Sequence, residues 1–166
     1  MPITPFHFGP GAVIHVLAPR HVSFLAFCAA NVLIDIEPLY YMLTHQDRLH
    51  RFFHTYVGAS LVALATFALF LGCRWCARKF WLPNPFQWQS LGLLAVAIGA
   101  AAGTCSHIVL DSVMHSDITP FAPFSDANPL YRLTTLPALH WLCLGSGAVA
   151  LLILGIRQFV VSRNAR

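Results

Sequence analysis

Charged residues are scarce in this chain, and their scarcity argues against an ordinary soluble domain. Only 10% of the 166 residues are Asp, Glu, Lys or Arg, whereas a typical soluble domain has about 25%. Hydrophobic residues make up 57% of the chain, and the mean hydropathy is +0.66. The composition therefore predicts a protein that lies in a lipid bilayer. Because no pattern of interleaved aromatic and basic residues is present, we expect no nucleic-acid partner.

Two further absences bear on the organisation of the chain. Residues 1–7 contain no Lys or Arg and are interrupted by proline and histidine, so they do not resemble a cleavable signal peptide. Cys73 and Cys76 have the spacing of a redox or zinc motif, but no second pair accompanies them, and we interpret the cysteines as structural or incidental. The sequence shows no internal repeat. We expect residues 1–166 to form a single integral-membrane domain.

Long apolar runs dominate what the sequence does contain. They predict an all-α, polytopic membrane protein with four to five hydrophobic helices. The first run is too short for an upright span, and the second is expected to stop at Pro38, because proline disfavours helix in the residue before it. Gly99 and Gly103 have a Gly-x-x-x-Gly spacing, which indicates close helix packing. The runs cover residues 8–18, 21–37, 51–73, 87–115 and 136–160.

The basic residues predict the orientation in the membrane. If the apolar segments alternate in direction, Arg48, Arg51 and Arg132 fall on one side and every other basic residue falls on the opposite side. The positive-inside rule makes the second side cytoplasmic. We therefore expect the N-terminus outside and the C-terminus in the cytoplasm. The cytoplasmic group consists of Arg20, Arg74, Arg78, Lys79, Arg157, Arg163 and Arg166.

Acidic residues and histidines gather at the predicted outer end. Every carboxylate of the chain and most of its histidines are expected there, at one face of the membrane. Random placement would rarely produce such a gathering, so it carries more weight than any single motif. The residues are Asp35, Glu37, Asp47, Asp111, Asp117 and Asp126, with His7, His45, His50, His54, His107 and His115.

The clearest local motif is formed by His107, Asp111 and His115, which stand four residues apart at the end of the fourth run. On a helix these positions share one face. Ionisable groups in a membrane segment usually mark a site, and imidazole with carboxylate suits a divalent metal. For His115, a role as a ligand and a place in the following loop are both compatible with the sequence.

Two other segments supply candidates at the same depth. Asp35 and Glu37 end the second run, where the helix dipole disfavours two carboxylates without a compensating cation. His50 and His54 are four residues apart and can chelate one ion if they lie on a helix. Arg51 between them is placed to donate to an anionic substrate.

The expected ligands include no thiolate. Imidazoles and carboxylates suit zinc in a catalytic site, with manganese or iron as alternatives, and their number allows one ion or two. Glu37 is a further ligand or the general base. His15, His21 and His140 lack local acidic partners, and we interpret them as structural or interfacial. The metal ligands predicted are His7, Asp35, His50, His54, His107 and Asp111.

Taken in order, these motifs resemble the LexA-regulated, membrane-bound metal-dependent hydrolases of the YdjM-like family. Residues 5–7 stand where that family has Thr-His, residues 35–37 where it has Asp-x-Asp, and residues 106–111 match its Ser-His-x-x-x-Asp motif. Residues 50–55 depart from its His-Arg-Gly-x-Thr-His-Ser motif, because the glycine is missing and the histidines stand one residue closer. The resemblance covers residues 5–124 and implies a metal-dependent hydrolase in the bacterial inner membrane. A more distant similarity to the zinc phospholipase C and S1/P1 nuclease group favours phosphoester substrates.

The favoured interpretation is hydrolysis of a phosphoester or lipid-linked substrate at the outer membrane face. Water activated by the metal would attack, and Arg51 would stabilise the negative charge. A metal or proton transporter is the main alternative, but it would hold its charged groups near the bilayer midplane. A structural metal that joins helix ends would use the same ligands and lack an open coordination position. The expected partners are membrane lipids and the substrate.

Overall fold

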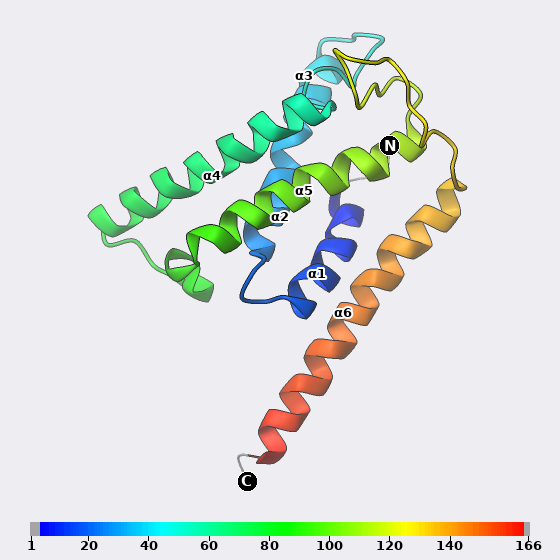
Figure 1. Cartoon of the computed structure of the whole chain (residues 1–166). Coiled ribbons are helices and arrows are strands. Elements are labelled where there is room, and N and C mark those ends of the chain that lie inside the picture. The colour runs from blue at the N-terminus through cyan, green and yellow to red at the C-terminus, as the bar shows by residue number, and fades with distance from the viewer. Residues whose placement is uncertain (1–3, 165–166) are drawn as a thin grey trace.

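The computed structural model is all-α over the residues that it describes, 4–164 (Figure 1). This confirms the fold class expected from the apolar runs. The elements in chain order are the 3₁₀ helix η1 (Thr4–His7), α1 (Phe8–Leu17), α2 (Phe24–Ile34), α3 (Ile36–Leu43), α4 (Tyr56–Lys79), the 3₁₀ helix η2 (Pro85–Ser90), α5 (Leu93–Met114) and α6 (Leu136–Asn164).

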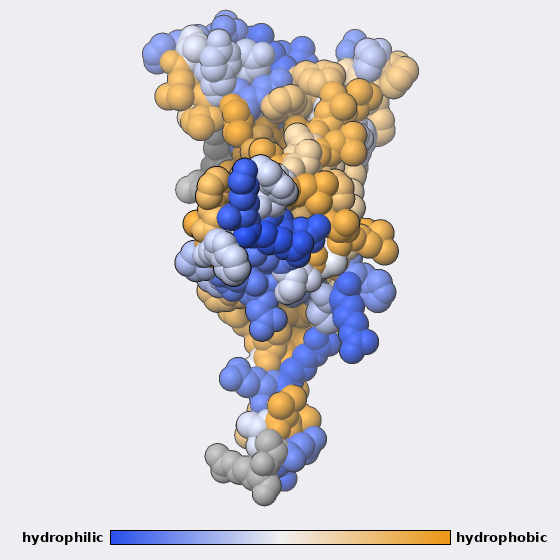
Figure 2. All heavy atoms as spheres, turned by 90° about the vertical axis from the view of Figure 1, so that its left-hand side faces the viewer, coloured by the Kyte–Doolittle hydropathy of each residue, from blue (hydrophilic) through white to orange (hydrophobic). Residues whose placement is uncertain are grey.

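Four helical stretches are long and apolar enough to cross a bilayer: α2 with α3, α4, α5 and α6. Figure 2 shows hydrophobic side chains below the hydrophilic end that carries α3, and they surround a second hydrophilic patch near the middle of this face. These candidate spans indicate a multi-pass membrane protein. Helix α1 has 10 residues, so it is about 15 Å long, roughly half the thickness of the hydrocarbon core. The first apolar run is therefore too short to span, as expected.

Helices α2, α4 and α5 form the core beneath the site. Small residues let α5 approach α2 closely, because a Cβ atom on Gly99 would collide with the Ser23 carbonyl oxygen and one on Gly103 would lie 2.6 Å from the Phe27 carbonyl oxygen. The Gly-x-x-x-Gly spacing therefore packs two helices together, as predicted. Two buried apolar clusters fill the space between the three helices: Ala26, Ala30, Val96 and Ala100, and Ile34, Ala59, Val62 and Ile108.

The second apolar run does not stop at Pro38. Helix α2 ends at Ile34, Asp35 lies between the two helices, and α3 starts at Ile36. Pro38 then falls in the first turn of α3, where proline is tolerated because its missing N–H would have no partner in the helix. Glu37 also lies in that first turn, where the helix dipole favours a carboxylate. The break at Asp35 thus separates two carboxylates that the sequence alone placed at one helix end.

Helix α6 packs against α1 and η1 and leaves most of its surface uncovered. The contact with α1 is close at Gly9, where a Cβ atom would collide with the Cys143 carbonyl oxygen. Leu139 and Cys143 of α6 also bury their side chains against Leu110 and Val113 near the end of α5. These contacts hold η1, and with it His7, against the end of α5.

Candidate metal centre

Four segments that are far apart in the sequence meet at one end of the helix bundle. They are η1, the break at Asp35, the segment 50–55 before α4, and the last turns of α5. Thr55 caps α4 by accepting a hydrogen bond from Gly58 N–H, 3.0 Å away. Gly58 has no room for a side chain because the Phe52 carbonyl oxygen lies against it. The segment that carries His54 is therefore folded tightly onto the start of α4.

The first cluster consists of Asp35, His54, His107 and Asp111, whose ligand atoms all lie within 4.8 Å of one another. His107 Nε2 lies 3.1 Å from Asp35 Oδ1 and 3.2 Å from Asp111 Oδ2. His54 Nε2 lies 3.7 Å from each of the same two oxygens. Ligands that surround a tetrahedral zinc ion at 2.0–2.2 Å lie roughly 3.3–3.6 Å apart. These four separations are therefore close to those that one such ion requires.

Hydrogen bonds orient His107 towards the cluster. Asn31 donates from Nδ2 to the Phe27 carbonyl oxygen at 2.9 Å, so its Oδ1 is the acceptor for His107 Nδ1–H at 3.0 Å. With the proton on Nδ1, the lone pair of His107 Nε2 faces Asp35 and Asp111. A metal-binding imidazole needs this tautomer, and an acceptor behind the ring fixes it.

His7 lies beside the first cluster and contacts two of its members. Its Nδ1 is 3.0 Å from His107 Nδ1, and its Nε2 is 3.2 Å from Asp111 Oδ1. The one proton on His107 Nδ1 therefore has two acceptors within reach, Asn31 Oδ1 and His7 Nδ1, while His7 Nε2 faces Asp111. The structure therefore brings His7 to the centre as a neighbour of Asp111. Its role as a metal ligand stays a prediction.

Glu37 stands behind His54. Its Oε2 lies 3.8 Å from His54 Nδ1, and its two carboxylate oxygens accept hydrogen bonds from Phe52 N–H at 3.1 Å and Phe53 N–H at 2.8 Å. Glu37 thus holds the backbone just before His54 and faces the ring nitrogen that points away from the cluster.

A second cluster shares Asp111. It consists of His50, Asp111 and His115, again with ligand atoms within 4.8 Å of one another. His50 Nδ1 donates to the Asp117 carboxylate at 3.0 Å, and His50 N–H donates to Asp117 Oδ2 at 3.1 Å. Asp117 therefore orients His50 as Asn31 orients His107. His115, which the sequence left open between ligand and loop residue, lies within this cluster.

Several buried nitrogens of the centre have no hydrogen-bond partner among the described residues. They include both ring nitrogens of His54 and Nε2 of His107. His54 and His107 are 0% exposed, and Asp111 is 5% exposed. Buried polar atoms without partners are costly, and a cation shared with the carboxylates would satisfy Nε2 of His54 and Nε2 of His107, whereas Nδ1 of His54 faces Glu37. The cluster could therefore hold a metal ion.

The electrostatic environment differs between the two loop histidines. Burial, together with His54 and His115, lowers the pKa of His50, so it is neutral near pH 7, as a ligand must be. Burial also opposes the charged form of His54, but the carboxylates of Asp35 and Glu37 outweigh it and raise the pKa of His54. A metal ion at this site would therefore compete with a proton for His54.

Arg51 does not reach either cluster. Its Nη2 donates to Gln46 Oε1 at 2.6 Å, its Nε donates to the Arg48 carbonyl oxygen at 3.2 Å, and its guanidinium lies over the Tyr41 ring. Its proposed contact with an anionic substrate therefore requires the substrate to extend beyond the two clusters.

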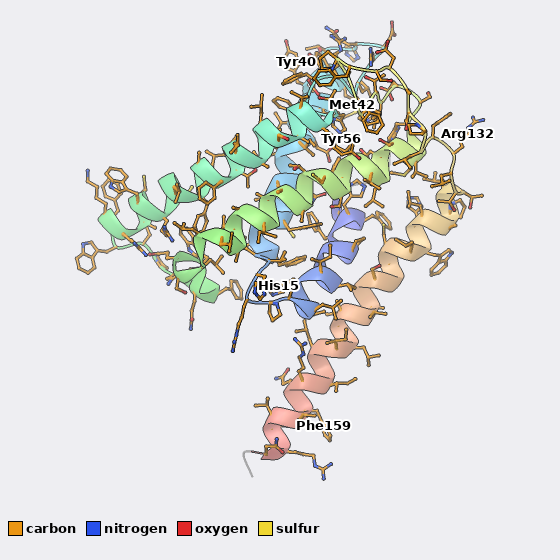
Figure 3. All side chains as sticks on the ribbon, in the orientation of Figure 1. His15, Tyr40, Met42, Tyr56, Arg132 and Phe159 are labelled. Carbon is orange, nitrogen blue, oxygen red and sulfur yellow. The ribbon has the colours of Figure 1, made fainter. Side chains whose placement is uncertain are left out.

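The structure brings together most of the histidines and carboxylates singled out from the sequence. His50 and His54 do not chelate one ion from a helix, because residues 50–55 are irregular and the two rings serve different clusters. His15 donates from Nδ1 to the Val22 carbonyl oxygen at 2.7 Å, far from this end of the molecule, as its structural interpretation requires (Figure 3). Asn31 is not among the residues predicted from the sequence. Its only signal is a polar side chain in an apolar helix, four residues before Asp35.

No protein-family model, curated protein or solved structure matches this chain. The resemblance to the YdjM-like hydrolases therefore stays a prediction, and the function has to be argued from the site itself.

Proposed function

We propose that this protein is a metal-dependent hydrolase of the bacterial inner membrane that cleaves a phosphoester or lipid-linked substrate at the outer face. One observation carries the proposal. The ligand atoms of Asp35, His54, His107 and Asp111 lie close enough together to hold one ion, and Asp111 belongs to a second set with His50 and His115 that could hold another. Two neighbouring divalent ions are a common arrangement for phosphoester hydrolysis.

Zinc fits these donors best, because the ligands are imidazoles and carboxylates without thiolates. Bound zinc supplies a nucleophile at neutral pH and polarises a phosphoryl oxygen. Within the first cluster the Asp35 side chain is 29% exposed, whereas His54, His107 and Asp111 are exposed by 7% or less. Substrate therefore approaches from the side of Asp35, and the three buried side chains exclude water from the opposite side of the centre.

The general base is either Asp35 or Glu37. Asp35 is the partly exposed carboxylate of the cluster, whereas both oxygens of Glu37 already accept backbone hydrogen bonds. This supports a positioning role for Glu37, which holds His54 in place. Arg51 is a donor for the part of an anionic substrate that extends beyond the clusters.

The test is hydrolysis of a phosphodiester and phospholipid panel by detergent-purified protein, with bound zinc measured on the same samples. We expect turnover that a chelator abolishes and zinc restores. Asp111→Asn should lose most of the zinc and the turnover, because both clusters share this carboxylate. Asp126→Asn is the matched control, since Asp126 is an acid at the same end that belongs to neither cluster, and it should behave like the unmodified protein.

Glu37→Gln separates the two roles of Glu37 in the same assay. If Glu37 is the general base, Glu37→Gln should keep zinc bound and reduce turnover by about 100-fold or more. If Glu37 only positions His54, Glu37→Gln should weaken zinc binding, and saturating zinc should restore turnover. This second result is the one we expect. Absence of chelator-sensitive turnover across the panel, together with zinc-dependent uptake into proteoliposomes, would replace the hydrolase with a transporter.

A further inference from the structure

A cavity of about 650 Å³ lies between the end of α5 and the start of α6. Its wall includes His115, which belongs to the second cluster, and residues 131–136 of the connecting segment. The rings of His115 and His50 are 4.4 Å apart. A group that enters this cavity is therefore adjacent to the second set of candidate ligands.

Arg132 is the cation that lines this cavity. Its backbone has φ 58°, a left-handed conformation that is uncommon for a residue with a side chain. The Arg132 N–H donates to the Val113 carbonyl oxygen at 2.9 Å, which fastens this conformation to the end of α5. Figure 3 shows Arg132 at the outer end, between α5 and α6.

The guanidinium of Arg132 has no ion pair or hydrogen bond with the protein within residues 4–164, although it lies 5.1 Å from the centre of the Tyr131 ring. The other two arginines of the outer end are already engaged. Arg48 donates to the Asp117 carbonyl oxygen and to Thr119 Oγ1, and Arg51 donates to Gln46. Arg132 therefore has its donors free for a ligand.

A second cavity at the outer end is less suited to an anion. It has a volume of about 340 Å³ and is lined by Arg48 and Arg51, but Asp126 also lines it and would oppose an anion. None of the residues of the two clusters lines it. The cavity beside His115 has a cation without a facing carboxylate and adjoins the candidate ligands.

The surroundings of the Arg132 cavity favour a lipid over a free anion. Leu133 and Leu136 at its edge are 71% and 49% exposed, at the end of a candidate membrane span. Further along α6, an apolar groove of about 470 Å³ runs between α6 and the start of α1, lined by residues that include Phe6, Gly9 and Leu151. A charged cavity at one end of α6 and an apolar groove further along the same helix would suit the headgroup and the acyl chains of a phospholipid.

We infer that the cavity beside His115 binds the phosphate-bearing headgroup of a membrane lipid, and that Arg132 anchors the phosphate by charge-assisted hydrogen bonds. Its placement next to the ions rests on the proposed function and extends it by naming the substrate class. The binding itself requires no turnover.

The test measures binding of fluorescent dioleoyl phosphatidic acid to the detergent-purified full-length protein, with zinc and with chelator. Arg132→Gln should weaken binding about tenfold or more, because it removes hydrogen bonds to a charged group. Arg132→Lys, which keeps the charge, should lose less affinity for phosphatidic acid than Arg132→Gln does. Arg157→Gln, on the cytoplasmic part of α6, should bind like the unmodified protein. Dioleoylglycerol, which lacks the phosphate, should bind equally to the unmodified protein and to Arg132→Gln.

Unchanged binding of phosphatidic acid by Arg132→Gln overturns the inference. So does complete displacement of the lipid by an equal concentration of inorganic phosphate, which would identify a site for the free anion. Arg132-dependent lipid binding without chelator-sensitive hydrolysis would leave the headgroup site standing and remove the proposed hydrolase.

Discussion

At the scale of single residues, Asn31 offers the sharpest test of the centre. It is fully buried, and its Oδ1 accepts the proton of His107 Nδ1. Asn31→Leu keeps the size of the side chain and removes this acceptor. We expect zinc affinity to fall 10–100-fold, as is typical when the group behind a metal-binding histidine is lost. Competitive titration with a chromophoric chelator measures the effect.

Thr104→Val is the control for Asn31→Leu. Thr104 is a buried polar residue on α5 whose hydroxyl donates within its own helix, to the carbonyl oxygens of Ala100 or Ala101. Its loss should leave zinc affinity unchanged. Equal affinity in Asn31→Leu and Thr104→Val would mean that Asn31 does not orient a ligand.

The sequence reveals the candidate ligands themselves but not their supporting partners. Histidines and carboxylates stand out in an apolar chain, so His54, His107 and Asp111 could be identified without a structure. The roles of Asn31 and Asp117 depend on the register of α2 against α5 and on the path of the segment 44–55. Neither follows from local pattern, because a buried amide can satisfy its own helix as well as a neighbour.

At the scale of helices, the close contact of α5 with α2 is open to a direct test. A Cβ atom on Gly103 would press on the Phe27 carbonyl oxygen and lie 3.1 Å from Asn31 Nδ2. Gly103→Ala should therefore push the helices apart, destabilise the protein by about 1–3 kcal/mol, and weaken zinc binding by moving Asn31. Thermal unfolding and zinc titration of the same sample measure both effects.

Gly155→Ala on α6 is the matched control, because nothing lies within 4 Å of a Cβ atom placed there. It should lower neither the melting temperature nor the zinc affinity, because alanine favours the helix. If Gly103→Ala also left the melting temperature and the zinc affinity unchanged, α2 and α5 would have room for a side chain between them.

Apolar runs predict the helices well and their ends poorly. The runs at 87–115 and 136–160 correspond to α5 and α6, whereas the run starting at residue 51 includes the irregular segment that carries His54. Hydrophobicity does not distinguish a loop folded onto a helix from the helix itself. Pro38 was expected to end a helix, but it lies in the first turn of α3. A proline is compatible with either position, and the sequence does not show where the new helix begins.

At the scale of the whole molecule, the distribution of arginines predicts the orientation in the membrane. Asp126 lies beyond α5 at the end that carries the candidate metal centre, and Lys79 ends α4 at the opposite end. In a cysteine-free variant of the chain, a cysteine at position 126 should react with a membrane-impermeant maleimide applied to intact cells, and a cysteine at position 79 should not. The reverse pattern would place the metal centre in the cytoplasm.

The order in which the helices are synthesised determines when a metal ion could bind at the candidate centre. Every residue of the two clusters precedes α6, and α5 carries both His107 and Asp111. During synthesis, no complete ligand set exists until α5 has entered the membrane, so nascent chains that end before it should not retain the ion. Helix α6 arrives last and packs on α1 and η1. Its insertion therefore follows that of every helix that carries a candidate ligand.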